Sequence, residues 1–449
     1  MQLIKSSKHN AGPVRLALAA ASASLLSGAV VHADENPWLA DSGLLVYSES
    51  GGRVQAVEPI VSLKKDMGDE HYLAMKFTFD SLTGATPNGA LPSKSTKTYT
   101  GPSGQKSYTT TVGELPLDDS FKDTRSAFNI SWDQPLGERN RVTVGANISH
   151  EYDFDSTGFN AAFARDFNDK NTTLSIGLGM ESDTIKAVGG IPDAFTSPPS
   201  TPSSDDDDNN INKQIRASSD TKKVNDILLG VSQVMNRRWL TQLNYSRSTA
   251  SGYQSDPYKI LSVVDTHGDT INDSNGASLL LYENRPSDRA RQSIYWSNKI
   301  HISDMDIVDV SYRHYWDDWG ITSETLDLRY RIAVSEHAYF EPHLRYYTQT
   351  GADFYRPFLV SGSDVINGVA QLDYASSDPR LAKLKGTTLG LKWGYELGRN
   401  SEFNIRVEQY KQTGDSMPAE AKNMPALSGL DLYPGLTATS LMVGYSFEF

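Results

Sequence analysis

Apolar and polar residues alternate along this chain with a period of two, most clearly over its last thirteen residues, 437–449. Larger apolar residues take most of the odd positions there, including Tyr445, Phe447 and Phe449, while mostly small or polar residues take the even ones. A period of two over this length predicts a β-strand with one apolar and one polar face. Such a strand closes a membrane β-barrel or ends a soluble β-sandwich, and the rest of the chain distinguishes the two.

The same alternation recurs along the chain and predicts sixteen strands, with fourteen or eighteen as the alternatives. In residues 172–181, for example, Leu174, Ile176 and Leu178 share one face, and serine and glycine take the other. Pro59 is awkward inside its expected strand because proline has no N–H to donate to a ladder. The expected strands are 44–50, 57–64, 72–80, a stretch ending at 132, 141–152, 158–167, 172–181, 224–235, 239–247, 288–301, 307–317, 323–334, 339–348, a stretch around 389–396, 402–411 and 437–449.

Short and long connections are sorted by their place between these strands. Every connection after an even-numbered strand is short, whereas every long segment follows an odd-numbered one. The long segments are 84–118, 182–221, 248–287, 350–381 and 413–434. This sorting is typical of barrels with short periplasmic turns and long external loops. The sequence therefore predicts an all-β, transmembrane, antiparallel up-and-down β-barrel whose lumen is wider than side chains can fill.

The N-terminus has the composition of a secretory signal peptide over residues 1–33. Basic residues precede an alanine-rich apolar run at 16–31, and small residues surround an expected cleavage site after Ala33. We expect a periplasmic lead at 34–42 and the barrel at 43–449. The expected location is the bacterial outer membrane, with membrane lipid and the barrel-assembly machinery as partners. The terminal aromatics Tyr445, Phe447 and Phe449 would form the assembly signal.

The amino-acid composition excludes several kinds of binding site and partner. The chain has no cysteine, which excludes disulfide frameworks and cysteine metal sites. Its formal net charge of −13 makes nucleic acid an unexpected partner. Four consecutive aspartates at 205–208 could hold a divalent cation or form a solvated loop tip, and we favour the loop tip. No cofactor and no metal site is expected.

Charged residues gather on the expected inner face of four consecutive strands between 288 and 348. A charge on the lipid face of a barrel costs roughly 2–4 kcal/mol at mid-membrane, so these residues must face water. They are Arg289, Arg291, Lys299, Asp309, Arg313, Tyr315, Asp327, Arg329, Arg331, Glu341, His343 and Arg345. One interpretation is a salt-bridged wall that stabilises the barrel. The other is a surface that selects small anionic solutes, because arginines favour anions.

Several segments resemble a family of bacterial outer-membrane proteins known only as a domain of unknown function. These segments are 80–87, 256–259, 282–286, 315–320, 341–347 and 353–358. The resemblance spans nearly the whole chain after residue 33, although the aspartate-rich insertion near 197–215 departs from the pattern. It implies a barrel without an assigned biochemistry, and it carries over no catalytic residues.

Three functions are consistent with this sequence. The first is a channel or solute-translocating barrel, and the second is a barrel plugged by its loops that acts as a scaffold or receptor. The third is an outer-membrane hydrolase using His314 with Asp317 or Asp318. The alternation places His314 on the lipid-facing side, and no nucleophile elbow or metal-spaced histidine cluster accompanies it. We therefore do not expect an enzyme.

Overall fold

The computed structural model describes residues 37–104, 107–199, 216–273, 276–303, 305–398 and 401–449. The expected signal peptide at 1–33 and the aspartate run at 205–208 lie outside the described residues. Within the described part of the chain, no helix has the length and apolar character needed to cross a membrane.

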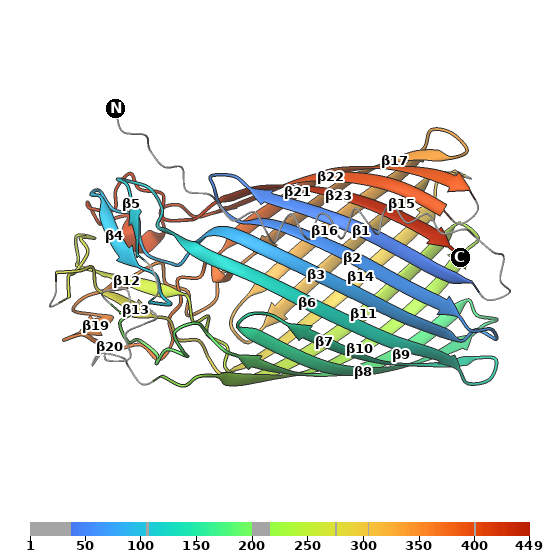
Figure 1. Ribbon diagram of the computed structural model, residues 1–449, viewed down its shortest axis with the longest axis horizontal. Coiled ribbons are helices and arrows are strands. Elements are labelled where there is room, and N and C mark those ends of the chain that lie inside the picture. The colour runs from blue at the N-terminus through green and yellow to red at the C-terminus, as the bar shows by residue number, and fades with distance from the viewer. Residues whose placement is uncertain (1–36, 105–106, 200–215, 274–275, 304, 399–400) are drawn as a thin grey trace, which may run out of the picture.

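Sixteen antiparallel strands form one closed barrel, each paired with its neighbours in chain order (Figure 1). The predicted fold class and strand number are confirmed. In order they are β1 (Trp38–Glu49), β2 (Gln55–Asp66), β3 (Tyr72–Pro87), β6 (Leu117–Pro135), β7 (Asn140–His150), β8 (Phe154–Phe167), β9 (Thr172–Ile185), β10 (Asp220–Asn236), β11 (Trp239–Gly252), β14 (Asp288–His301), β15 (Ile307–Asp317), β16 (Thr322–Ala333), β17 (Ala338–Gln349), β21 (Leu384–Gly398), β22 (Ser401–Gly414) and β23 (Leu436–Glu448).

The first and last strands close the barrel. β1 pairs with β23 from Leu39 opposite Glu448 to Glu49 opposite Ala438. Trp38 and Phe449 exchange both backbone hydrogen bonds, at 2.7 and 2.9 Å. The expected periplasmic lead at 34–42 is therefore wrong at its end, because β1 already begins at Trp38. Small residues on the outer face of β1 near its start make the alternation of apolar and polar residues too weak to recognise in the sequence.

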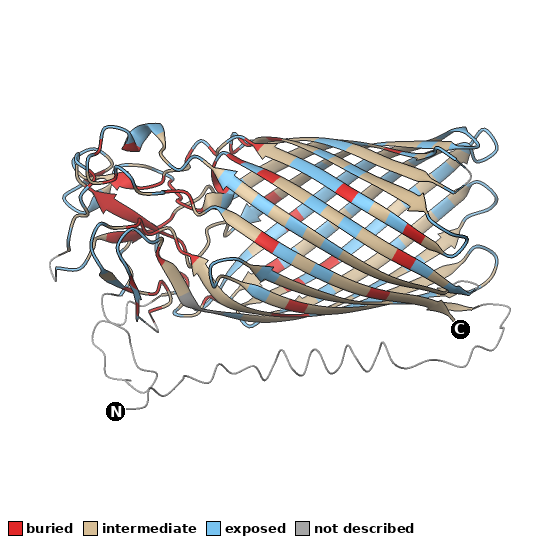
Figure 2. Ribbon diagram, turned by 90° about the horizontal axis from the view of Figure 1, so that it is seen from above, coloured by how far each residue is buried: buried red, intermediate tan, exposed pale blue. Residues whose placement is uncertain are grey.

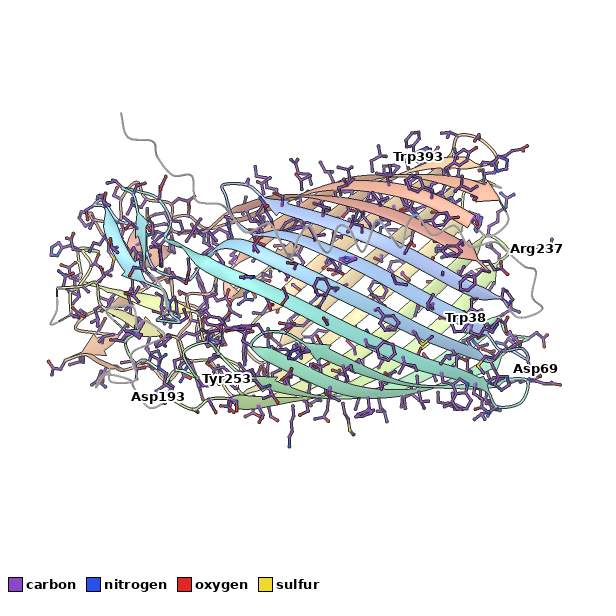
Figure 3. All side chains as sticks on the ribbon, in the orientation of Figure 1. Trp38, Asp69, Asp193, Arg237, Tyr253 and Trp393 are labelled. Atoms are coloured by element: carbon purple, nitrogen blue, oxygen red, sulfur yellow. The ribbon has the colours of Figure 1, made fainter. Side chains whose placement is uncertain are left out.

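The long loops gather at one end of the barrel and the short turns at the other (Figure 1). Figure 3 shows Trp38, Asp69 and Arg237 at the end with short turns, and Asp193 and Tyr253 near the loops. We call the described parts of five loop segments the cap. These segments are residues 88–116, 186–219, 253–287, 350–383 and 415–435.

The cap has its own apolar core, which the sequence interpretation missed by treating these segments as plain loops. A three-stranded sheet joins β13 (Leu280–Tyr282), β12 (Ile260–Val264) and β18 (Leu359–Val360). Figure 2 shows that buried residues concentrate in the cap, while the barrel wall alternates between less buried positions. The remaining short elements are β4 (Lys97–Thr100), β5 (Ser107–Thr110), β19 (Val365–Ile366), β20 (Val369–Ala370), η1 (Pro379–Leu381) and η2 (Ala419–Ala421).

Candidate functional site

The charged residues of β14 to β17 share one face of the sheet. The register of the antiparallel strands places Arg291 opposite Asp317, Arg313 opposite Thr325, and Asp327 opposite Arg345. Directly paired residues of antiparallel strands point to the same side. The same ladders place the whole predicted set on that side. The set is Arg289, Arg291, Lys299, Asp309, Arg313, Tyr315, Asp327, Arg329, Arg331, Glu341, His343 and Arg345.

Contacts that pass over an intervening strand identify this side as the inner one. His343 Nδ1 on β17 lies 2.8 Å from Glu408 Oε1 on β22, although β21 runs between them. Tyr339 Oη on β17 likewise donates to Glu402 Oε1 on β22 at 2.8 Å. Strands two apart are separated by roughly 10 Å, so side chains meet over the strand between them most readily on the concave face of a barrel.

Two glycines of β21 leave room for these crossings. A Cβ atom at Gly394 would lie 2.3 Å from the Tyr339 ring, and one at Gly390 would lie 2.8 Å from Cγ of Glu408. Any larger residue would displace the crossing side chains. The glycines therefore let the wall carry interactions between strands that share no ladder.

Most charges of the wall are paired. Arg289 donates to Asp317 at 3.0 Å, Arg331 to Glu396 at 3.0 Å, and Arg406 to Glu341 at 3.4 Å. His343 bridges Asp327 at 3.1 Å and Glu408, and the weaker contacts Arg329–Asp327 and Lys299–Asp309 measure 3.6 and 3.8 Å. These contacts favour the salt-bridged interpretation for most of the predicted residues.

Three arginines of the wall depart from this pattern. Within the described residues, no carboxylate lies within ion-pair distance, 4.0 Å, of Arg291, Arg313 or Arg345. Arg291 donates to Ser248 Oγ at 3.0 Å, and Arg313 lies 5.1 Å from the centre of the Tyr295 ring. Arg313 and Arg345 are exposed, so water in the lumen reaches both guanidinium groups. They are the positions where the wall can bind an anion directly.

The wall next to the arginines, from β7 to β11, carries many small inner-face residues. The ladders place these residues in line around the barrel, where they leave space for solvent. The inner-face residues of this wall include Gly145, Asn147, Ser149, Gly158, Asn160, Ala162, Gly177, Gly179, Gly230, Asn244, Ser246 and Ser248. The lumen next to the arginine wall is therefore lined mostly by short side chains along β7 to β11.

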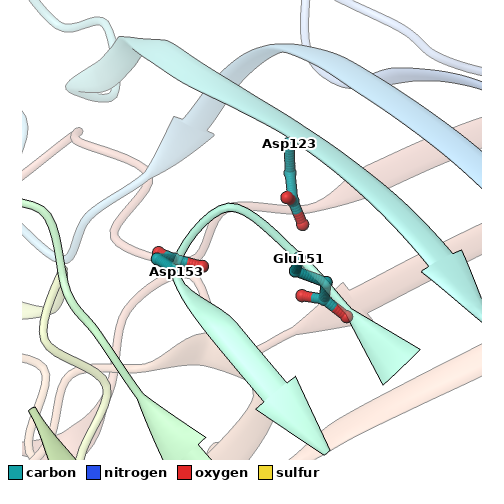
Figure 4. Close-up of side chains that lie close together, drawn as sticks. All are labelled: Asp123, Glu151 and Asp153. Atoms are coloured by element: carbon teal, nitrogen blue, oxygen red, sulfur yellow. The ribbon is translucent and has the colours of Figure 1, made fainter. Parts of the chain in front are cut away.

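A group of carboxylates stands near the external mouth, between β6 and the β7–β8 turn. Oxygen atoms of Asp123, Glu151 and Asp153 lie within 4.8 Å of one another (Figure 4). Tyr258 of the cap donates to Asp153 at 2.5 Å. Ca²⁺ takes six to eight oxygen ligands, so three carboxylates alone define no metal site. The sequence interpretation missed this group because its members come from elements that meet only when the barrel closes.

Ion pairs tie the cap together, and those of Arg285 are buried. Arg285 lies 2.6 Å from Glu283 and 2.8 Å from Asp378, and Arg380 lies 2.6 Å from Asp256. Burial alone would raise the pKa of Asp378, but Arg380 and Arg285 hold that pKa well below its usual value. Burial also raises the pKa of Glu283, and Arg285 offsets only part of this effect. These pairs fix segment 253–287 to segment 350–383.

A cavity of about 920 Å³ lies between the cap and the strand ends next to it. Its lining includes Arg53 of the β1–β2 turn, Gln412 of β22, and Lys259 and Arg380 of the cap. The cap thus covers a chamber at this end of the barrel, with both charged and apolar side chains in its lining.

The residues considered for a hydrolase do not come together. His314 accepts or donates a hydrogen bond with Glu324 at 2.7 Å, on the face opposite the arginines. Asp317 holds Arg289 on the inner face, and Asp318 accepts from the backbone N–H of Ala290 at 2.9 Å. The predicted assembly residues Tyr445, Phe447 and Phe449 form a run of ring contacts, with centroids 5.2 and 5.5 Å apart.

A closed antiparallel barrel of sixteen strands, with long loops at one end and short turns at the other, is an outer-membrane-type barrel. The chain belongs to the family described as "Protein of unknown function (DUF3570)", whose family model matches residues 15–447. The resemblance noted in the sequence is therefore confirmed.

The chain is also similar to several solved structures at low sequence identity. One is a bacterial polysaccharide outer membrane secretin, with 9% identity, a TM-score of 0.41, and coverage of 92% of this chain and 98% of that one. A second is the CymD monoaromatic hydrocarbon channel, at 8% identity and a TM-score of 0.39, covering 92% and 88%. A third is the ferric enterobactin receptor PfeA from Pseudomonas aeruginosa, at 8% identity and a TM-score of 0.40, covering 84% and 54%. No curated protein matches the chain.

Proposed function

We propose that this protein is an outer-membrane channel that conducts small solutes and favours anions. The observation that carries the proposal is the pair Arg313 and Arg345, two exposed guanidinium groups on the inner face without a carboxylate partner among the described residues. Exposed arginines on a channel wall attract anions and bind carboxylate or phosphate oxygens in a bidentate manner. The small residues of β7 to β11, which adjoin the arginine wall at β14, supply space in the lumen beside them.

The proposal includes the route to the membrane. After cleavage behind Ala33, the chain crosses the periplasm, and the assembly machinery recognises Tyr445, Phe447 and Phe449 at its C-terminus. The apolar outer face then contacts membrane lipid, and the acidic cap faces outward. Small anionic solutes are the expected cargo, and neither a cofactor nor nucleic acid is involved.

A solute-flux experiment tests the proposal. The refolded protein is placed in vesicles, and uptake is compared for gluconate, glucose and glucosamine, which are similar in size but differ in charge. We expect gluconate to enter fastest and glucosamine slowest, because the exposed arginines attract one and repel the other. Equal rates for all three, in a conducting barrel, would refute anion preference.

A second candidate is a non-conducting barrel that acts as a scaffold or receptor. The apolar core and buried ion pairs of the cap favour it, because a cap fixed in this way could keep the external mouth shut. In that case none of the three solutes enters the vesicles, even though the barrel is folded.

A further inference from the structure

The barrel wall is incomplete at its external end between β6 and β7. β6 pairs with β3 up to Leu117, but its ladder with β7 ends at Ser126 opposite His150. The chain then turns back into β8, which leaves residues 122–125 of β6 without a ladder partner on that side within the described chain. An unpaired strand edge needs water or another polar partner, so it marks an opening in the wall.

The chamber under the cap reaches this opening from the inside. Its lining includes Lys122, Asp123 and Thr124 on one lip of the gap, and Tyr152 and Asp153 on the other. Lys122 and Thr124 alternate with Asp123 along β6, so residues of both faces of that strand border the same cavity. The cavity therefore extends to the edge of the wall.

An apolar groove reaches the same place from the outside. It has a volume of about 740 Å³ and its upper end lies at Ser126 and His150, the last ladder pair below the gap. Apolar side chains on the lipid-facing surface dominate its lining. These side chains are Pro59, Val61, Phe77, Phe79, Phe128 and Ile148. An acyl chain or another apolar chain fits such a surface without exposing itself to water.

The lips of the gap carry three carboxylates together with Lys122 and with Arg125, whose guanidinium group is paired with Asp80. Asp123 stands on β6, and Glu151 and Asp153 stand in the β7–β8 turn, with their carboxylates directed toward one another across the gap (Figure 4). Neither Asp123 nor Glu151 forms an ion pair with a basic side chain within the described residues. The charge of the lips is complementary to a cation.

We propose that the gap between β6 and the β7–β8 turn is a lateral port for an amphiphile with an apolar chain and a positively charged head. The chain lies in the groove on the lipid face, and the head lies against the carboxylates of Asp123 and Glu151. From there the molecule has a path between the outer leaflet and the chamber under the cap. The port does not depend on the anion preference of the lumen, because the two surfaces lie on different strands.

A labelling experiment tests the port directly. Because the chain has no cysteine, a Thr124→Cys variant carries a single bimane label at the lip. The labelled protein is refolded in vesicles of zwitterionic phospholipid and titrated with two nitroxide quenchers that share a hexadecyl chain. One quencher has a quaternary ammonium head, and the other has a phosphate head. We expect the ammonium quencher to act at concentrations about tenfold lower, since the carboxylates attract one head and repel the other.

Three variants of the labelled protein separate specific entry from simple partitioning. Asp123→Asn with Glu151→Gln should remove the about tenfold preference, because the charge of the lips is lost. Ser126→Trp, at the top of the groove, should abolish saturable quenching, whereas Ala161→Trp, elsewhere on the lipid face, should leave it unchanged.

Equal quenching by both heads, or quenching that Ser126→Trp does not change, would show partitioning into the bilayer only and would overturn the port. Each variant is checked for the heat-modifiable mobility of a folded barrel. Solute flux is measured on the same vesicles, so failure of the port and failure of the channel give different results.

Discussion

Replacing both unpaired arginines of the lumen, in an Arg313→Gln and Arg345→Gln double variant, should weaken anion selectivity without unfolding the barrel. The two residues lie on β15 and β17, and β16 separates them. Strands two apart are separated by roughly 10 Å, which is within the combined reach of two arginine side chains. One solute can therefore contact both guanidinium groups.

The size of the effect follows from Coulomb's law in a water-filled lumen. A unit charge about 4 Å from a permeating ion contributes about 1 kcal/mol in water, and salt screens part of it. Removing two such charges should cost a passing anion about 1–2 kcal/mol, which is roughly a fivefold to thirtyfold fall in the anion-to-cation permeability ratio. Folding should be little affected, because neither arginine forms an ion pair with a described carboxylate.

The assay is the reversal potential under a salt gradient in a planar bilayer. The matched control is Arg139→Gln with Arg237→Gln, which removes the same charge from exposed periplasmic turns. The control should keep most of the selectivity of the unaltered protein. If the lumen variant keeps its selectivity, or if the control loses as much, the reasoning that assigns selectivity to the two exposed arginines is refuted.

Further predictions concern the wall, the cap and the closing strand. Gly394→Ala should destabilise the barrel by about 1–3 kcal/mol, because its Cβ would meet the Tyr339 ring, and urea unfolding measures this. Arg285→Met should destabilise the cap by about 3–5 kcal/mol, because it leaves Glu283 and Asp378 buried without this partner, and limited proteolysis of the cap measures this. Because the pKa of Asp378 is lower in the folded cap than in the unfolded chain, its ionised carboxylate stabilises the cap at any pH above the usual aspartate pKa, about 3.9. This stabilisation is lost only as the pH falls through the lowered pKa of Asp378. The cap should therefore resist protease at about pH 4, and Arg285→Met should move the loss of resistance to higher pH. Deleting Phe449 should lower the yield of closed barrel, because two backbone hydrogen bonds to β1 are lost, and heat-modifiable mobility measures this.

Each of these predictions has a control in the chain. Gly398→Ala adds a Cβ where no atom lies within 4 Å and should leave stability unchanged. Arg356→Met removes a cap arginine whose hydrogen bonds, among the described residues, go to backbone carbonyls, so protease resistance should hold. Phe449→Tyr keeps the backbone bonds and the ring, and its yield should match that of the unaltered protein. A destabilised control, or a stable variant, would contradict the physical reason given for that site.

The barrel could be predicted from the sequence because each strand carries its own signal. The period of two in residues 172–181 or 437–449 needs no knowledge of neighbouring strands, and loop lengths then set the direction of each one. The signal fails where side chains are small, as at the start of β1. The sequence also made Pro59 an unfavourable residue for a strand. The structure accommodates it because the ladder of β2 and β3 has no assigned pair at residues 58 and 59.

The cap and the details of the wall depend on contacts between distant residues. β12 and β18 pair in parallel although about a hundred residues separate them, and such short strands have no period to read. The inner face of the wall was predictable by alternation, but its ion pairs were not. Asp327 stands directly opposite Arg345 in the ladder, yet it contacts Arg329 and His343, and His343 also reaches over β21 to Glu408. Such contacts are fixed only when the barrel closes.

The measurement that tests the central claim most directly is the single-channel current of the refolded protein in a planar bilayer. The account predicts discrete current steps and a reversal potential on the anion side under a salt gradient. A folded, heat-modifiable barrel that carries no current, or one that prefers cations, would contradict it.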